Sequence, residues 1–212
     1  MDRYERKLRE EGYRFICGAD EAGRGPLAGP VVAAAVILDP DLPIAGIADS
    51  KKLTPKTREL LAKIIKEKAI AYAIASVSES RIDQINILEA SKEAMTEAIK
   101  TLKAEPDYIL TDYVELSGFK APLTAIVKGD QLSASIAAAS ILAKTARDEI
   151  MARMDILYPG YGFAVHKGYP TKAHLEALDR LGVSKIHRCS YKPVKSRLAR
   201  QLCLEFGGET IG

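Results

Sequence analysis

The sequence predicts an α/β fold, in which helices flank a mixed sheet and a helical region follows at the C-terminal end. Two apolar stretches of strand length come first, and the short glycine-rich turn between them makes them antiparallel neighbours. Strand-like and helix-like segments then alternate, which is typical of a sheet covered by helices. After Pro159 the pattern becomes helical. We therefore expect a sheet domain over residues 1–158 and a helical region over residues 159–212 packed on it.

Apolar alternation and helix caps place the elements of the first half. A helix begins at Thr54-Pro55, because Thr is a good N-cap and Pro suits the first helical position. A second helix is predicted over Ser80–Leu102, with a break near Asn86. The predicted strands are Phe15–Glu21, Val31–Leu38 and Ile70–Val77.

The second half is predicted to hold two strands and three helices. Tyr108–Tyr113 and Leu123–Val127 are apolar stretches of strand length. Leu132–Leu157 predicts one long helix, whose early alanines would let it approach a sheet closely. A short helix capped by Thr171 and a basic helix from Pro193 follow.

The composition indicates a compact soluble protein. Of 212 residues, 47% are hydrophobic and 28% are charged, which suits a single globular domain. No apolar run is long enough to span a membrane, and the charged N-terminal segment lacks the apolar core of a signal peptide. These features predict a cytoplasmic location. Cys17, Cys189 and Cys203 are widely spaced, which predicts neither a disulfide framework nor a thiolate metal site.

Basic residues concentrate near the end of the chain, although the net charge is only +3. Leu181–Leu204 contains no Asp or Glu. Its six Lys and Arg residues could form a cationic surface that attracts phosphate backbones. An ordinary solvated helix face is the alternative. The six residues are Lys185, Arg188, Lys192, Lys195, Arg197 and Arg200.

Four acids are candidate metal ligands because of where they lie. Asp20 and Glu21 end the first strand, Asp112 ends a later strand, and Asp130 precedes the alanine-rich helix. Strand ends and loops beside a sheet often display reactive groups. Carboxylates suit Mg²⁺ and Mn²⁺, and two such ions about 3.5–4 Å apart can bind a phosphodiester and activate water against it. The absence of His and Cys nearby in the sequence argues against zinc.

Each acid also has a simpler interpretation. Asp130 could cap the following helix, Asp112 could be a turn residue, and Asp20-Glu21 could be a solvated strand terminus. A geometric condition applies as well, since neighbours on a strand point to opposite faces. Asp20 and Glu21 can share one site only if the strand bends or ends there, or if Glu21 contributes its backbone carbonyl.

The segment Gly23–Pro30 is a glycine-rich turn that differs from the common nucleotide-binding loops. Its third glycine falls one place late for a dinucleotide fingerprint, and no Gly-Lys-Ser/Thr follows as in a phosphate loop. Its glycines would let the backbone approach a ligand, and Arg24 could grip a phosphate. The alternative is a tight hairpin turn with an exposed Arg24.

Five ordered motifs resemble the ribonuclease HII family and span Phe15 to Arg200. The run GADEAGRGPLAGPV, residues 18–31, resembles the family signature. The other matching stretches are Asp49–Leu53, Lys128–Asp130 leading to Ala137–Lys144, His166–Tyr169 and His187–Tyr191.

This resemblance implies an RNase H-like fold and a metal-dependent endonuclease. Such an enzyme would cut the RNA strand of RNA–DNA hybrids and would cut 5′ to ribonucleotides embedded in duplex DNA, leaving 3′-hydroxyl and 5′-phosphate ends. Asp20, Glu21, Asp112 and Asp130 would be its active-site carboxylates and would bind two Mg²⁺ or Mn²⁺ ions. Its biological role would be the removal of ribonucleotides from DNA, with no obligate protein partner.

The resemblance also implies which residues bind the substrate. Gly23, Arg24 and Gly25 would read the 2′-hydroxyl through backbone groups, and this hydroxyl is what separates RNA from DNA. Tyr169 would stack on the sugar of the next deoxynucleotide, and Lys51 would contact the phosphate backbone. Residues 1–158 would then be the catalytic domain, and residues 159–212 the substrate-binding region.

The chain departs from the family pattern at one place. The family commonly has Asp-Gly where this chain has Asp112-Tyr113. Asp107 precedes the strand and Glu115 lies beyond its end, so neither replaces Asp112 better. The sister family ribonuclease HIII usually has Glu at the fourth acid position and an extra N-terminal domain, so Asp130 and the short N-terminus favour HII.

Two other functions remain open from the sequence. A nuclease of related fold could act on DNA junctions, and it would cut branched substrates made only of DNA. A non-catalytic module could bind hybrid duplexes, and it would be expected to lack at least one of the carboxylates. All four are present.

Overall fold

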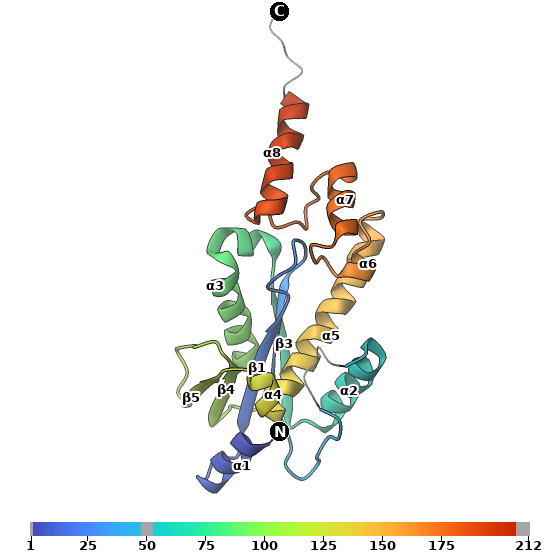
Figure 1. Cartoon of the computed structure of the whole chain (residues 1–212). Helices are drawn as coiled ribbons and strands as arrows, with labels where there is room; N and C mark the ends of the chain where they lie inside the picture. Colours follow the sequence, from blue (N-terminus) through green and yellow to red (C-terminus); the bar gives the residue numbers. More distant parts are fainter. Residues whose placement is uncertain (1, 48–52, 207–212) are drawn as a thin grey trace, which may run out of the picture.

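The computed structural model describes residues 2–47 and 53–206, which form a five-stranded sheet with helices on both faces (Figure 1). The order across the sheet is β3-β2-β1-β4-β5. The first three strands pair antiparallel, whereas β4 and β5 add parallel to β1. The predicted mixed sheet is confirmed. The first and last residues of every strand lie within one residue of the predicted ones. The strands are β1 (Ile16–Ala22), β2 (Val31–Ile37), β3 (Ala71–Val77), β4 (Tyr108–Asp112) and β5 (Leu123–Ile126).

The helices agree with the predictions except at three places. Thr54 caps α2, accepting a hydrogen bond from the N–H of Thr57, and Asn86 breaks α3 with a φ of 69°. The sequence predicted neither α1 nor α6. The prediction of one long helix from Leu132 is wrong. The short helix α4 ends at Leu132, and a separate helix, α5, begins at Ala134 after Ser133. The helices are α1 (Arg3–Glu10), α2 (Pro55–Lys68), α3 (Glu79–Lys100), α4 (Gly129–Leu132), α5 (Ala134–Leu157), α6 (Phe163–His166), α7 (Lys172–Leu181) and α8 (Lys192–Phe206).

The central strand β1 lies between two apolar layers. Helix α3 covers one face of the sheet, whereas α5 and α2 cover the other. The expected close approach of α5 is confirmed, since Ala137–Ala139 are fully buried. A Cβ atom added to Gly18 would lie 2.1 Å from the backbone of Ser135. Glycine at this position therefore lets α5 lie directly on β1, two residues before Asp20.

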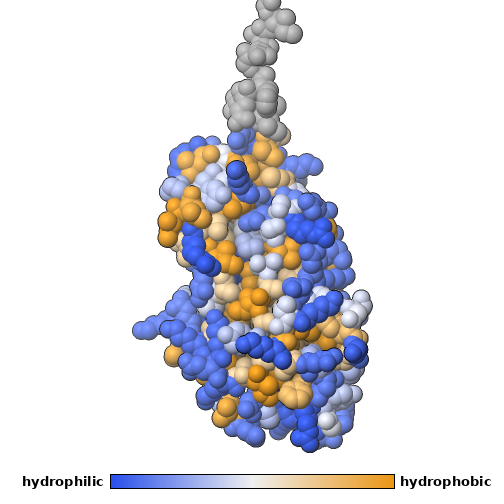
Figure 2. All heavy atoms as spheres, turned by 180° about the vertical axis from the view of Figure 1, so that it is seen from behind, coloured by the Kyte–Doolittle hydropathy of each residue, from blue (hydrophilic) through white to orange (hydrophobic). Residues whose placement is uncertain are grey.

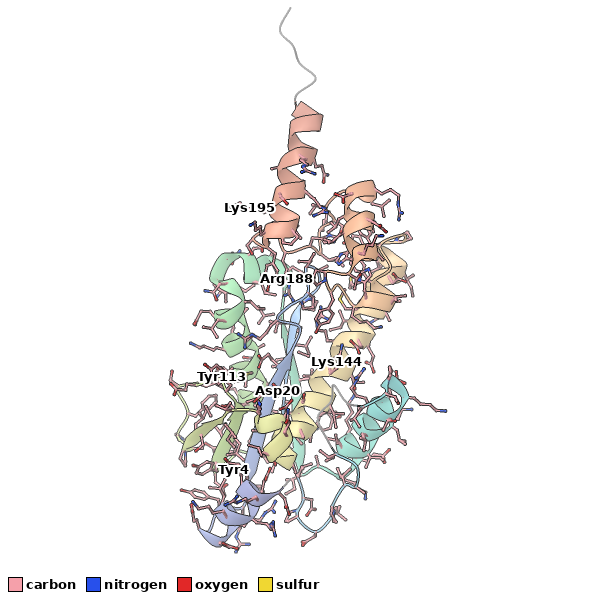
Figure 3. The ribbon with its side chains drawn as sticks, viewed as in Figure 1. Tyr4, Asp20, Tyr113, Lys144, Arg188 and Lys195 are labelled. Atoms are coloured by element: carbon pink, nitrogen blue, oxygen red, sulfur yellow. The ribbon has the colours of Figure 1, made fainter. Side chains whose placement is uncertain are left out.

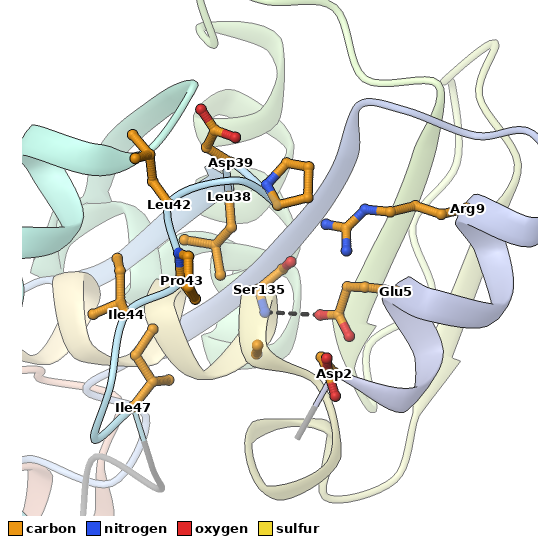
Figure 4. A pocket seen from close by; sticks show the side chains of 12 residues that line it. Asp2, Glu5, Arg9, Leu38, Asp39, Leu42, Pro43, Ile44, Ile47 and Ser135 are labelled. Carbon is orange, nitrogen blue, oxygen red and sulfur yellow. Dashed lines mark hydrogen bonds between the residues drawn. The ribbon is translucent and has the colours of Figure 1, made fainter.

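Helix α1 anchors the start of α5 (Figure 4). Its Glu5 is 1% exposed, and Glu5 Oε1 accepts hydrogen bonds from Ser133 Oγ at 2.6 Å and from the N–H of Ser135 at 2.8 Å. These bonds satisfy backbone and side-chain donors at the N-terminus of α5, where a negative charge is also favourable. The charged N-terminal segment is thus part of the sheet domain.

The C-terminal helices share an apolar core with the glycine-rich turn. Leu27 and Ala28 of the turn pack with Phe163, Leu178 and Val194. Helix α8 extends away from this core (Figure 1).

The surface of the molecule on the side facing away from the viewer in Figure 1 is mainly polar, with hydrophilic side chains around scattered apolar ones (Figure 2). None of the helices in the described ranges combines the length and apolar character that a membrane crossing requires.

Candidate active site

The acids gather where β1 and β4 end side by side. The two strands are parallel neighbours, and Ala19 pairs with Thr111, so Asp20 and Asp112 follow at the same level. Strand β5 is parallel to β4, and α4 begins just after it with Gly129 and Asp130. The N–H of Gly129 donates to Asp112 Oδ1 at 2.7 Å. The topology therefore brings Asp20, Asp112 and Asp130 to one edge of the sheet.

Asp20 is a buried carboxylate held by its neighbours. It is 6% exposed, its Oδ1 accepts the N–H of Glu21 at 2.7 Å, and it forms a side-chain hydrogen bond with Ser140 of α5. Burial raises the pKa of Asp20 well above its usual range, and the negative charges of Glu21 and Asp112 raise it further. The interpretation of Asp20-Glu21 as a solvated strand terminus is therefore wrong.

Glu21 has one carboxylate oxygen that no donor of the described residues binds. Its side chain is 7% exposed, and its Oε1 accepts a hydrogen bond from Arg24 Nη1 at 3.3 Å. Glu21 Oε2 is buried and has no hydrogen-bond partner among the described residues. Burial raises the pKa of Glu21, the Arg24 guanidinium opposes this shift, and the charge of Asp112 adds to it. A divalent cation would satisfy a buried carboxylate oxygen of this kind beside other acids.

Asp20 and Glu21 are neighbours within the regular part of β1, so their side chains lie on opposite faces of the sheet. Asp20 forms a hydrogen bond with Ser140 of α5, so its side chain lies on the face of the sheet that α5 covers. Because side chains alternate along a strand, Glu21 lies on the same face as Cys17 and Ala19, which pack against α3. Strand β1 stops at Ala22, and Gly23 follows with a φ of 103°. Pairing with β2 continues past Glu21 to Ala22, so the strand does not end between Asp20 and Glu21, and a site shared by both side chains stays a prediction.

The simpler interpretations of Asp130 and Asp112 have different outcomes. Ser133 caps α5, and Asp130 is 3% exposed within α4, so the helix-cap interpretation is wrong. Asp112 does support a turn, because it binds the N–H of Gly129 and its backbone oxygen accepts the N–H of Val114. Tyr113 takes a φ of 62°, the left-handed region that favours glycine. Tyr113 thus has a backbone conformation that suits glycine, the residue that the family commonly has after this Asp.

The donor chemistry of these acids fits a hard divalent cation. Oxygen-only ligands suit Mg²⁺ and Mn²⁺. Within the residues that the structure describes, no three Asp, Glu, His or Cys side chains are arranged so that they could hold a metal as they stand. One oxygen each of Asp20, Asp112 and Glu21 is engaged by a protein donor. Metal binding therefore requires these side chains to turn toward a common point.

The glycine-rich turn is wedged between the sheet domain and the C-terminal helices. The N–H of Leu27 donates to the oxygen of Gly168 at 2.8 Å, and the N–H of Gly29 donates to Ile186 at 2.9 Å. Residues 26–29 are buried. The interpretation as a simple hairpin turn is wrong, although the side chain of Arg24 is 45% exposed and pairs with Glu21.

Tyr169 lies against this turn. A Cβ atom on Gly25 would be 3.7 Å from Tyr169 Cε1, and Tyr169 is 40% exposed. Lys144 Nζ lies 5.8 Å from the centre of the same ring. Figure 3 shows Asp20 and Lys144 on facing elements near the middle of the molecule. The structure thus brings Tyr169 to the predicted substrate turn, while Lys51 lies outside the described residues.

Sequence reasoning missed several residues that shape the site. Ser140 lies in the alanine-rich motif, but nothing in the sequence links it to Asp20. Arg188 was assigned to a cationic surface, and this is wrong, because it is fully buried. Arg197 is bound to Asp179 at 2.8 Å. The exposed basic residues of the segment are Lys185, Lys192, Lys195 and Arg200.

Comparison with known proteins identifies the family. The model of the family described as Ribonuclease HII matches residues 17–194. The chain is 56% identical to ribonuclease HII of Moorella thermoacetica over 89% of this chain and 92% of that protein. It is 53% identical to ribonuclease HII of Acholeplasma laidlawii, over 92% and 96% of the two chains.

Solved structures share the fold. The crystal structure of ribonuclease H2 from Pyrococcus horikoshii OT3 has a TM-score of 0.74 at 27% identity, covering 87% of this chain and 97% of that one. The ribonuclease HII of Archaeoglobus fulgidus, solved as a complex with PCNA, has a TM-score of 0.72 at 27% identity, covering 84% and 94%. The chain belongs to the ribonuclease HII family and is a metal-dependent endonuclease of the ribonuclease H type that acts on RNA–DNA hybrids.

Proposed function

We propose that this enzyme also cuts 5′ to ribonucleotides embedded in duplex DNA, by a two-metal mechanism that leaves 3′-hydroxyl and 5′-phosphate ends. The observation that carries the proposal is Glu21 Oε2, which is buried and has no hydrogen-bond partner among the described residues. It belongs to a residue that interacts with Asp20 and Asp112 and that lies two residues before the glycine-rich turn. A buried carboxylate oxygen without a hydrogen-bond donor would be stabilised by a cation. A cation bound at Glu21 would lie next to the glycine-rich turn, which we propose to bind the ribose.

Four carboxylates would hold the ions: Asp20, Glu21, Asp112 and Asp130. When bound, two divalent ions would neutralise the scissile phosphate, activate the attacking water and stabilise the leaving oxygen. Ser140 and the N–H of Gly129 orient Asp20 and Asp112. The ions would be Mg²⁺ or Mn²⁺, on the chemistry of an all-oxygen ligand set.

Substrate recognition would fall to the turn and to the C-terminal region. Backbone groups of Gly23, Arg24 and Gly25 would meet the 2′-hydroxyl, and the Tyr169 ring beside them would stack on the following sugar. We propose that residues 1–158 catalyse the reaction and that residues 159–212 bind the duplex. The role in the cell would be the removal of ribonucleotides from DNA in the cytoplasm.

The test is cleavage of a DNA duplex that contains one ribonucleotide, with the ends mapped in the presence and absence of Mg²⁺ or Mn²⁺. We expect metal-dependent cleavage on the 5′ side of the ribonucleotide, and weaker cleavage by Tyr169→Ala than by Tyr169→Phe. Cleavage of an all-DNA junction instead would favour a junction nuclease. Binding of this duplex without cleavage at the ribonucleotide would contradict the proposal.

A further inference from the structure

Two arginines lie fully buried under the glycine-rich turn and bind its backbone. Arg147 and Arg188 are both 0% exposed. Neither forms an ion pair with a carboxylate among the residues that the structure describes. A buried guanidinium costs considerable free energy unless its donors are satisfied, and here backbone carbonyls satisfy them. Such a costly arrangement suggests a task beyond filling space.

Arg188 holds the entrance and exit of the turn together. Its Nη2 donates to the oxygen of Gly23 at 2.6 Å, and its Nη1 donates to the oxygen of Arg24 at 3.0 Å. Nε and Nη2 both donate to Gly29, at 3.0 and 2.8 Å. The Tyr191 hydroxyl accepts from Arg188 Nη1 at 3.0 Å and donates to the Arg24 oxygen at 2.7 Å. The planar guanidinium thus makes four hydrogen bonds to three carbonyls from a rigid fork, whereas a lysine has only three donors and no fixed plane.

Arg147 serves a different part of the turn. Its Nε, Nη1 and Nη2 donate to the oxygens of Pro30, Lys167 and Ala28, each at 3.0 Å. It therefore ties the far end of the turn to the loop before Tyr169. The carbonyls of Gly23 and Arg24 are instead bound by Arg188, with Tyr191 as a second donor to the Arg24 oxygen.

The position of these carbonyls determines where the next N–H groups point. In a planar trans peptide, the C=O and the N–H of the following residue point in opposite directions. Because the oxygens of Gly23 and Arg24 face Arg188, the N–H groups of Arg24 and Gly25 face away from it. Neither N–H finds an acceptor within the described ranges. Two free backbone donors are thus displayed next to Glu21 and the Tyr169 ring.

We propose that Arg188, assisted by the Tyr191 hydroxyl, is a positioning residue that fixes two backbone N–H groups for the 2′-hydroxyl of the substrate. This inference rests on the proposed function, in which the turn reads that hydroxyl. Donors that are held in place before binding lose little entropy when the substrate arrives. Arg188 therefore contributes to the discrimination of ribose from deoxyribose without touching the substrate.

The test compares Tyr191→Phe and Arg188→Lys with the wild-type protein. Tyr161→Phe is a matched control, since within the described ranges its hydroxyl donates to the oxygens of Gly182 at 2.9 Å and Leu181 at 3.4 Å and not to the turn. Affinities are measured without divalent ions for two duplexes, one all-DNA and one with a single ribonucleotide. Thermal unfolding of each variant is recorded alongside.

We expect Tyr191→Phe to lower the ratio of the two affinities about fivefold, the value of roughly one hydrogen bond, with the all-DNA affinity unchanged. Arg188→Lys should lower the ratio further, and Tyr161→Phe should leave it unchanged. An unchanged ratio in Tyr191→Phe would overturn the inference, as would a parallel loss of affinity for both duplexes. If the wild-type protein does not discriminate, the proposed function itself fails, which separates the two failures.

Discussion

At the scale of single residues, protein donors bind one oxygen of each of the proposed metal ligands Asp20, Glu21 and Asp112. Ser140 and the N–H of Glu21 bind Asp20, and the N–H of Gly129 binds Asp112. Burial and mutual repulsion raise the pKa of both Asp20 and Glu21. The metal-free protein therefore carries a free-energy cost at this edge of the sheet, which a bound cation would relieve.

Asp20→Asn should separate activity from stability. Asn keeps the volume and can still accept the bonds from Ser140 and Glu21, but it removes a repelling charge. We expect cleavage to fall at least about a hundredfold, because ion binding weakens. The melting temperature without metal should rise by a few degrees, since about 1 kcal/mol corresponds to roughly 2–4 °C at this size.

The control for this experiment is Asp41→Asn, which removes an exposed acid from the loop after β2. It should change neither cleavage nor melting temperature. An Asp20→Asn protein that cleaves normally would remove Asp20 from the site.

At the scale of elements, the strands were predictable because each shows a short apolar pattern bounded by turns. The helix break before α5 was not predicted, since Ser133 sits in a sequence that continues with good helix formers. The buried contact of Glu5 was also beyond sequence reasoning, because its partner Ser135 is 130 residues away. The same holds for Arg188, whose bonds to Gly23 span 165 residues. A basic residue near other basic residues gives no sign that it is buried.

Glu5→Ala should destabilise the junction of α1 and α5. The change leaves the N–H of Ser135 and the hydroxyl of Ser133 without their acceptor in a buried place. We expect a loss of about 1–2 kcal/mol in the free energy of unfolding, measured by urea denaturation. Glu10→Ala, an exposed site on the same helix, should cost little. Equal stability of the two variants would contradict the anchoring role of α1.

At the scale of the whole molecule, three histidines form a buried network in the C-terminal region. His187 Nδ1 accepts the N–H of Ser184, so its proton is on Nε2, which lies 3.1 Å from His174 Nε2. His174 Nδ1 then donates to the oxygen of Tyr169 at 3.0 Å. This chain of hydrogen bonds requires neutral rings, and it helps to hold the loop that carries Tyr169.

The stability of the protein should therefore fall as the pH is lowered from about 6.5 toward 4. Burial lowers the pKa of His174 and His187 to about 4, whereas both rings titrate near 6.5 in an unfolded chain. Between these values the unfolded chain binds up to two more protons, so acid favours unfolding. Melting curves from pH 7 to 5 test this, and His187→Asn should show a weaker pH dependence. An equal pH dependence in the variant would exclude His187 as a source.

Duplex binding should depend on salt through the exposed basic residues near α8. Lys192→Ala combined with Lys195→Ala removes two exposed cations. We expect weaker binding of all duplexes and a salt slope reduced by about one per lost phosphate contact, with ribose discrimination unchanged. Lys103→Ala with Lys120→Ala, on exposed sites of the sheet domain, is the control. Identical salt slopes in the two double variants would contradict substrate binding by the C-terminal region.

The central claim is that carboxylates from separate parts of the chain bind divalent ions beside the ribose-reading turn. Titration of the protein with Mn²⁺, followed by the signal of the free ion in electron paramagnetic resonance, tests this most directly. We expect saturable binding by the wild-type protein and by Asp41→Asn, with at least about tenfold weaker binding by Asp20→Asn and Asp112→Asn. Asn at position 112 can still accept the N–H of Gly129, so a loss there would reflect the missing charge. Binding of Mn²⁺ with the same affinity and stoichiometry in all four proteins would contradict the claim.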